Sequence, residues 1–177
     1  MKMKTAYSVS GYNYAYHRRW EHTIKFITYP DGKVLVAGGA YFEKRLEKHY
    51  CKVFDYTHFD LNSKWELIGK YDTILCFQTI EHLLNPLLFL VECKNHLRDK
   101  GLLYISYPTH GTKPFWSSGH FNEYDKSRFE YLLEVAGLEV VKYQEKTMWR
   151  RIKGIRSIIR NTPIGWCKHQ YYCVRAE

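Results

Sequence analysis

Short apolar runs alternate with helix-like segments along this chain, and the alternation limits the folds that it can adopt. Three runs are mainly apolar: residues 33–37, 71–77 and 102–107. Runs this short and this apolar are typical of strands that a parallel sheet buries on both faces. Because helix-like segments separate them, the sequence predicts an α/β fold with a parallel or mostly parallel sheet covered on both faces.

The remaining elements complete this pattern. Helical spacing of apolar residues occurs at 13–28, 41–50, 86–97 and 126–136. Asp125 is expected to cap the last helix and Gly137 to follow its end. Further strands are expected at 51–55, 138–143 and 170–175. No ordinary crossover helix separates the last two, so they are expected to pair antiparallel at one edge of the sheet.

Length and composition favour one globular domain over residues 1–177. Apolar residues make up 45% of the chain and charged residues 25%, which excludes disorder for most of it. No stretch of ~20 apolar residues could span a bilayer, and no apolar stretch follows the basic start in the manner of a signal peptide. The five cysteines form no CxxC pair. We expect Cys51, Cys76 and Cys173 to be buried free thiols of a cytoplasmic protein, and we expect no metal site.

The positive charge is concentrated near the end of the chain. The net charge is +9, and residues 142–177 hold nine basic and two acidic residues. Within them, residues 147–165 are predicted to be a basic amphipathic insertion. Such a segment can pack on the sheet as a cover helix. It can also lie on an anionic membrane or bind a lipid-linked substrate. A third alternative is binding to nucleic-acid phosphates, but the sequence contains no recognised RNA-binding motif. The expected location is therefore the cytoplasm, with attachment to the membrane surface as the alternative.

A glycine-containing turn follows the first predicted strand. Ligands of parallel α/β sheets bind at the carboxyl ends of the strands, beside the point where strand order reverses. Gly38 and Gly39 would let a ligand approach the backbone there. Ala40 and Phe42 stand where a GxGxG loop would carry its other glycines. An ordinary strand-to-helix turn is the alternative interpretation.

Two acids follow at useful separations. Asp55 lies 17 residues after Gly38, at the predicted end of the next strand. Dinucleotide folds place a ribose-binding acid ~20 residues after the glycines, and a carboxylate can accept hydrogen bonds from both ribose hydroxyls. Asp60 could approach an adenine amino group. The alternatives are a surface aspartate that ends a strand and a turn or helix-cap aspartate.

The middle of the chain resembles a known enzyme family. Residues 71–86 (YDTILCFQTIEHLLNP) resemble the fourth-strand block of class I S-adenosylmethionine-dependent methyltransferases, most closely the small-molecule branch called type 11. Residues 96–108 (HLRDKGLLYISYP) are similar to the same family's next strand block, and residues 121–141 to its following helix and strand.

The resemblance implies a three-layer Rossmann-like fold with a mostly parallel, seven-stranded sheet and an antiparallel last strand. Few residues separate Asp55 from Tyr71, so six strands are the alternative. The implied cofactor is S-adenosylmethionine. The residues implied to contact it are Gly38, Gly39 and Ala40 at the methionine part, Asp55 at the ribose, Asp60 at the adenine, and Cys76, Phe77 and Gln78 along the fourth strand.

Histidines near the mouth of the sheet are the candidate catalytic residues. A hydroxyl or amine acceptor benefits from a general base, and imidazole suits that role near neutral pH. His82 is the first candidate, followed by His120 and His110. The alternatives are a helix-orienting role for His82 and solvated loop positions for the other two.

The sequence therefore predicts methyl transfer to a small-molecule or lipid- or sugar-linked acceptor. Two alternatives stay open. One is a non-catalytic binding or scaffold protein of the same fold, which Ala40 and Phe42 favour. The other is an RNA methyltransferase, which only the positive charge of the chain supports.

Overall fold

A six-stranded mixed sheet organises the molecule. The computed structural model describes residues 19–28, 30–38, 43–109, 119–149 and 166–177. The strand order is β2-β1-β3-β4-β6-β5. The strands are β1 (Val34–Val36), β2 (Asp55–Tyr56), β3 (Tyr71–Phe77), β4 (Leu97–Pro108), β5 (Leu138–Trp149) and β6 (Trp166–Ala176). The first four run parallel, whereas β6 runs antiparallel to β4 and β5. The mixed sheet with an antiparallel edge pair is confirmed, with six strands in the part of the chain that the structure describes.

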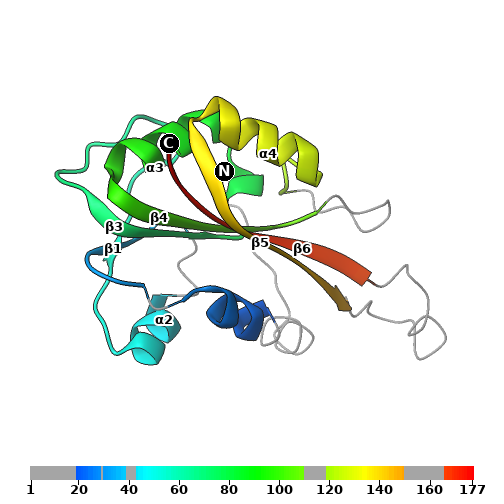
Figure 1. Ribbon diagram of the computed structural model, residues 1–177, viewed down its shortest axis with the longest axis horizontal. Helices are drawn as coiled ribbons and strands as arrows, with labels where there is room; N and C mark the ends of the chain where they lie inside the picture. The colour runs from blue at the N-terminus through cyan, green and yellow to red at the C-terminus, as the bar shows by residue number, and fades with distance from the viewer. Residues whose placement is uncertain (1–18, 29, 39–42, 110–118, 150–165) are drawn as a thin grey trace, which may run out of the picture.

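Helices cover both faces of the sheet. Helices α3 (Pro86–His96) and α4 (Lys126–Val135) lie on one face, and α2 (Glu43–Tyr50) and helical residues 19–26 lie on the other (Figure 1). Alternate residues of β3 enter two separate cores. Ile74 and Cys76 pack in the core beneath α3 and α4, whereas Leu75 and Phe77 pack in the core beneath α2. This two-sided burial explains why the strand is apolar at almost every position.

The strand expected at residues 51–55 is largely wrong. Cys51 follows the end of α2 with a φ of 50°, and its side chain is exposed. Only Asp55 of the expected strand belongs to β2, whose partner β1 is itself three residues long. The expected burial of Cys51 is therefore also wrong, while Cys76 and Cys173 are buried as free thiols.

The two late strands are longer than expected. They pair from Leu138↔Ala176 to Trp149↔Trp166, so residues 147–149 belong to β5. The start of the predicted basic insertion is thus a strand, and residues 150–165 lie outside the described residues, as do 13–18 of the predicted first helix. None of the helices in the described ranges is long and apolar enough to cross a membrane.

The predicted cap of α4 is confirmed and gives a stability prediction. The Asp125 carboxylate accepts a hydrogen bond of 2.9 Å from the backbone N–H of Arg128, and Gly137 follows the helix with a φ of 71°. Asp125→Ala should lower the free energy of unfolding by ~1 kcal/mol, because one helix-terminal N–H loses its acceptor. Thermal unfolding followed by circular dichroism should show a midpoint ~2–4 °C lower. Asp125→Ser, which keeps a capping oxygen, should stay close to the parent; equal losses in both variants would contradict the capping role.

Candidate functional site

The order of the parallel strands places the site. β1 lies between β2 and β3, and the chain passes from β1 to β2 on one side before it crosses to β3 on the other. Strand order therefore reverses at β1, and a ligand crevice is expected outside the carboxyl ends of β1 and β3. Gly38 leaves the first of these strands, and Gln78 and Thr79 leave the second.

Gly38 lies just beyond the carboxyl end of β1, where this crevice is expected. Its φ of +77° lies in the left-handed region, and a Cβ atom there would stand 2.4 Å from Cγ2 of Thr79. Its backbone N–H donates a 3.1 Å hydrogen bond to Oγ1 of Thr57, which follows β2. The turn therefore joins the ends of three strands and has no room for a side chain at this position. Gly39 and Ala40 lie outside the described residues.

Of the three residues predicted along β3, only Gln78 lies beyond the end of the strand, and its side chain is partly exposed. Its backbone N–H donates to the carbonyl of Ser106 in β4 over 2.7 Å, and its side-chain carbonyl accepts from Arg19 over 3.2 Å. Cys76 and Phe77 are buried in the cores on opposite faces of the sheet. Burial also raises the pKa of the Cys76 thiol, so this side chain stays protonated.

The two predicted cofactor acids occupy different places. Asp55 lies opposite Leu35 in the ladder, and its half-exposed carboxylate is 3.2 Å from Nζ of Lys33, the residue before β1. This ion pair directs the carboxylate towards the amino end of β1. Asp60 is exposed, and the backbone and side-chain amides of Asn62 both donate to its carboxylate, which lowers the pKa of Asp60.

The segment that carries Asp60 is fastened beside the connection from β3 to α3. The side-chain oxygen of Asn62 accepts hydrogen bonds from the backbone N–H groups of Leu84, over 2.6 Å, and Asn85, over 3.1 Å. The structure therefore brings Asp60 to the site side of β3, whereas the Asp55 carboxylate points to the other end of the strands.

A buried carboxylate lies directly after β3. Glu81 belongs to the short helix η1 (Ile80–His82) and is only 1% exposed. Among the described residues, its Oε2 has no hydrogen-bond partner. Burial raises the pKa of the Glu81 carboxyl to about 8, and the charge of Arg19 opposes this rise. For Glu81 the sequence suggested only that the Glu81-His82 pair caps and orients the next helix; no catalytic or binding role was predicted for it.

Two of the three predicted histidines meet above Glu81. The Nδ1 atom of His82 is 2.6 Å from the carbonyl of Gly119, and since a carbonyl can only accept, this nitrogen carries the proton. The other ring nitrogen of His82, Nε2, lies 4.0 Å from Oε1 of Glu81. The ring of His120 stands edge-on to that of His82 with centroids 4.9 Å apart. His110 lies outside the described residues.

Backbone hydrogen bonds hold the two segments of this cluster together. The Glu81 carbonyl accepts from the N–H groups of Phe121, over 2.9 Å, and Asn122, over 3.1 Å. The side-chain amide of Asn122 also donates to the carbonyl of Leu83. The hydrogen bonds of Phe121 and Asn122, the two residues that follow His120, therefore hold the His120 backbone beside Glu81.

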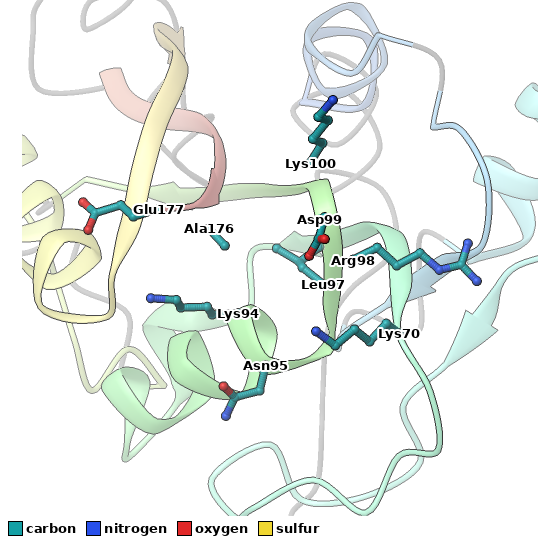
Figure 2. A pocket seen from close by; sticks show the side chains of 9 residues that line it. All are labelled: Lys70, Lys94, Asn95, Leu97, Arg98, Asp99, Lys100, Ala176 and Glu177. Atoms are coloured by element: carbon teal, nitrogen blue, oxygen red, sulfur yellow. The ribbon is translucent and has the colours of Figure 1, made fainter.

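A separate pocket of about 440 Å³ lies at the opposite end of the parallel strands (Figure 2). Lys70 precedes β3, Leu97 begins β4 and Ala176 ends β6, so the pocket faces the amino ends of the parallel strands. Basic side chains line much of it: Lys70, Lys94, Arg98 and Lys100. It contains none of the predicted site residues.

Comparisons with known proteins agree with this architecture. A family model described as a methyltransferase domain matches residues 34–143, from β1 into β5. No curated protein matches the chain.

Solved structures show the same fold at low sequence identity. An S-adenosylmethionine-dependent methyltransferase from Mesorhizobium loti is similar with a TM-score of 0.63 and 10% identity, over 92% of this chain and 98% of that one. A second such methyltransferase, from Clostridium acetobutylicum, has a TM-score of 0.52 and 8% identity, over 96% and 93%. The [4+2]-cyclase SpnF has a TM-score of 0.65 and 12% identity, over 97% and 84%. The fold therefore carries more than one reaction among these neighbours.

Proposed function

Because the chain belongs to the methyltransferase domain family, we propose that it uses S-adenosylmethionine to methylate a hydroxyl or amine of a small molecule, or of a lipid- or sugar-linked acceptor, beside His82 and His120. The observation that carries the acceptor site is the position of the two imidazoles. They stand over a buried carboxylate directly after β3, one of the two strands whose ends flank the crevice.

The residues around the crevice fit S-adenosylmethionine. Gly38 keeps the carboxyl end of β1 free of a side chain, the exposed Asp60 carboxylate can accept from the adenosine part, and Gln78 offers a polar edge at the end of β3. Asp55 can serve the ribose once its carboxylate leaves Lys33, and half of its surface is already open to solvent. When bound, the cofactor supplies a methyl group on a sulfonium, which is an electrophile with a good leaving group.

The chain itself positions the acceptor and removes its proton. The hydrogen bond to Gly119 fixes the proton of His82 on Nδ1, so the lone pair lies on Nε2. That nitrogen can accept the proton of a hydroxyl placed between the two rings. General-base assistance of this kind contributes ~10²–10⁴-fold in rate.

Cofactor binding is tested by isothermal titration calorimetry with S-adenosylmethionine. Asp55→Ala and Asp60→Ala should each weaken binding by roughly tenfold or more, because each removes a charge-assisted hydrogen-bond acceptor. Asp99→Ala is the matched control, because Asp99 lines the pocket at the amino ends of the parallel strands, away from the proposed cofactor site. An absence of heat for the parent protein at millimolar cofactor would overturn the proposal. Loss in only one variant would assign the acidic role to that residue.

The charge of residues 147–165 supports an anionic acceptor or membrane surface as part of the same proposal. This segment holds five basic residues after Trp149: Arg150, Arg151, Lys153, Arg156 and Arg160. Co-sedimentation with anionic and neutral vesicles at two salt concentrations separates these cases. Salt-sensitive binding to anionic vesicles supports a lipid-linked acceptor, and absence from both pellets removes the membrane part of the proposal.

A further inference from the structure

Three potential metal ligands converge at the mouth of the sheet. One donor atom each from Glu81, His82 and His120 lies within 4.8 Å of the other two. Two imidazoles and one carboxylate are a ligand set of catalytic zinc and other divalent transition-metal sites, which leave coordination positions open for a substrate. The three side chains come from two segments, η1 and the stretch before α4.

The hydrogen bonds of His82 match those of a metal-binding histidine. Such a histidine usually donates its other ring N–H to a carbonyl or carboxylate, which fixes the tautomer and the ring orientation. His82 donates from Nδ1 to the Gly119 carbonyl and so turns Nε2 towards Glu81, whose Oε1 is 4.0 Å away. Near the other imidazole, Oε1 of Glu123 lies 4.0 Å from Nδ1 of His120 and adds a carboxylate beside the cluster.

An independent observation comes from the buried oxygen of Glu81. Glu81 is 1% exposed, and its Oε2 has no hydrogen-bond partner within the described ranges. A carboxylate oxygen buried without a partner is costly, and coordination to a cation removes that cost. The two hydrogen bonds to the Glu81 carbonyl hold the second segment in place, so the ligands are already gathered before a cation binds.

We propose that Glu81, His82 and His120 bind one divalent transition-metal ion, which presents open positions to an oxygen of the acceptor. Ligands held ~2.0–2.2 Å from one tetrahedral ion stand ~3.3–3.6 Å apart, so separations of up to 4.8 Å must shorten by up to ~1.5 Å. The His82 side chain, 46% of which is exposed, can rotate towards the other two ligands.

The assignment of an oxygen acceptor rests on the proposed methyl transfer. An acceptor hydroxyl bound to the ion loses its proton to solvent more readily, because the cation stabilises the resulting oxygen anion. The oxygen–carbon bond then forms as the carbon–sulfur bond breaks, and the electron pair stays on sulfur. The ion keeps its oxidation state. In the metal-bound protein His82 is a ligand, so the ion takes over from the free imidazole the activation of the hydroxyl.

The metal site is tested by titrating the full, untagged chain with Co²⁺ after dialysis against a chelator. The visible absorption of bound Co²⁺ should reach an end point at one ion per chain, and Zn²⁺ should displace it. His120→Ala and Glu81→Gln should each weaken Co²⁺ binding by at least roughly tenfold. His49→Gln is the matched control, since it removes a histidine from α2 on the far side of the sheet and should leave binding unchanged.

The variants are read together with cofactor binding and circular dichroism. His120→Ala should keep the parent spectrum and the parent affinity for S-adenosylmethionine, so a loss of Co²⁺ binding is not a loss of fold. Co²⁺ binding that is equal in the parent and His120→Ala, or absent from both, overturns the metal site. Co²⁺ binding without methyl transfer to any oxygen acceptor leaves the metal site standing and contradicts the proposed acceptor.

Discussion

Gly38→Val is expected to weaken S-adenosylmethionine binding by roughly a hundredfold, which corresponds to ~2.7 kcal/mol. The Cβ atom alone would lie 2.4 Å from Cγ2 of Thr79, and the φ of +77° is strained for a β-branched residue. The clash separates the ends of β1 and β3, which are the walls of the crevice. Overpacking of this kind also destabilises by ~1–3 kcal/mol, so the unfolding midpoint should fall as well. Calorimetry and thermal unfolding of the same samples measure the two effects.

A double-mutant cycle separates the clash from the backbone strain. Thr79→Ala removes both atoms that come closest to the added Cβ, Cγ2 at 2.4 Å and Oγ1 at 2.7 Å. Gly38→Ala combined with Thr79→Ala should therefore recover part of the affinity lost in Gly38→Ala alone, and the strain of the positive φ should remain. Strictly additive effects of the two substitutions would contradict a contact between these positions.

Phe129→Ala should lower the free energy of unfolding by ~3–5 kcal/mol. Phe129 is fully buried on α4, and its ring centroid lies 4.5 Å from that of Tyr107 and 5.0 Å from that of Tyr172. These rings join the helix to β4 and β6, so truncation leaves a cavity between the layers. For a chain of this length the midpoint of thermal unfolding should fall by ~6–20 °C.

Tyr131 gives the matched control for this prediction. It lies on the same helix, has a similar size and is 67% exposed. Tyr131→Ala should change the free energy of unfolding by ~0.5 kcal/mol or less. If both variants lose the same stability, the helix is held by something other than the buried ring cluster.

The elements predicted best from the sequence are those whose burial or ends are marked by their own residue types. β3 is buried on both faces, and its run of apolar residues gave its bounds; α4 carries both its cap and its terminal glycine. The outer part of the β5–β6 pair was missed because polar residues, 144–147 and 168–169, separate it from the predicted parts of these strands. There, Gln170 and Lys168 of one strand hydrogen-bond to Glu145 of the other, over 2.8 Å in each case. Backbone pairing defines these strands, and it leaves no apolar pattern to read.

The candidate site could be predicted only as far as its local motifs reach. Gly38, Gln78 and His82 follow strands that the sequence identified, so their positions at the carboxyl ends were predictable. The meeting of Glu81 with His120 depends on which carbonyl accepts from Phe121 and Asn122, and no spacing rule states that choice. Likewise, the ion pair of Asp55 with Lys33 is a side-chain orientation, which strand order alone does not determine.

The antiparallel ribbon of β5 and β6 extends well beyond the rest of the sheet (Figure 1). Beyond an irregularity between Val140 and Lys142, its ladder continues to the pair Trp149↔Trp166, so the strands on both sides of residues 150–165 are paired with each other. Lengthening such a closed segment costs little, only ~0.6 kcal/mol for each doubling of its length. Changes in the length or sequence of residues 150–165 are therefore expected to leave the register of β5 and β6 unaltered.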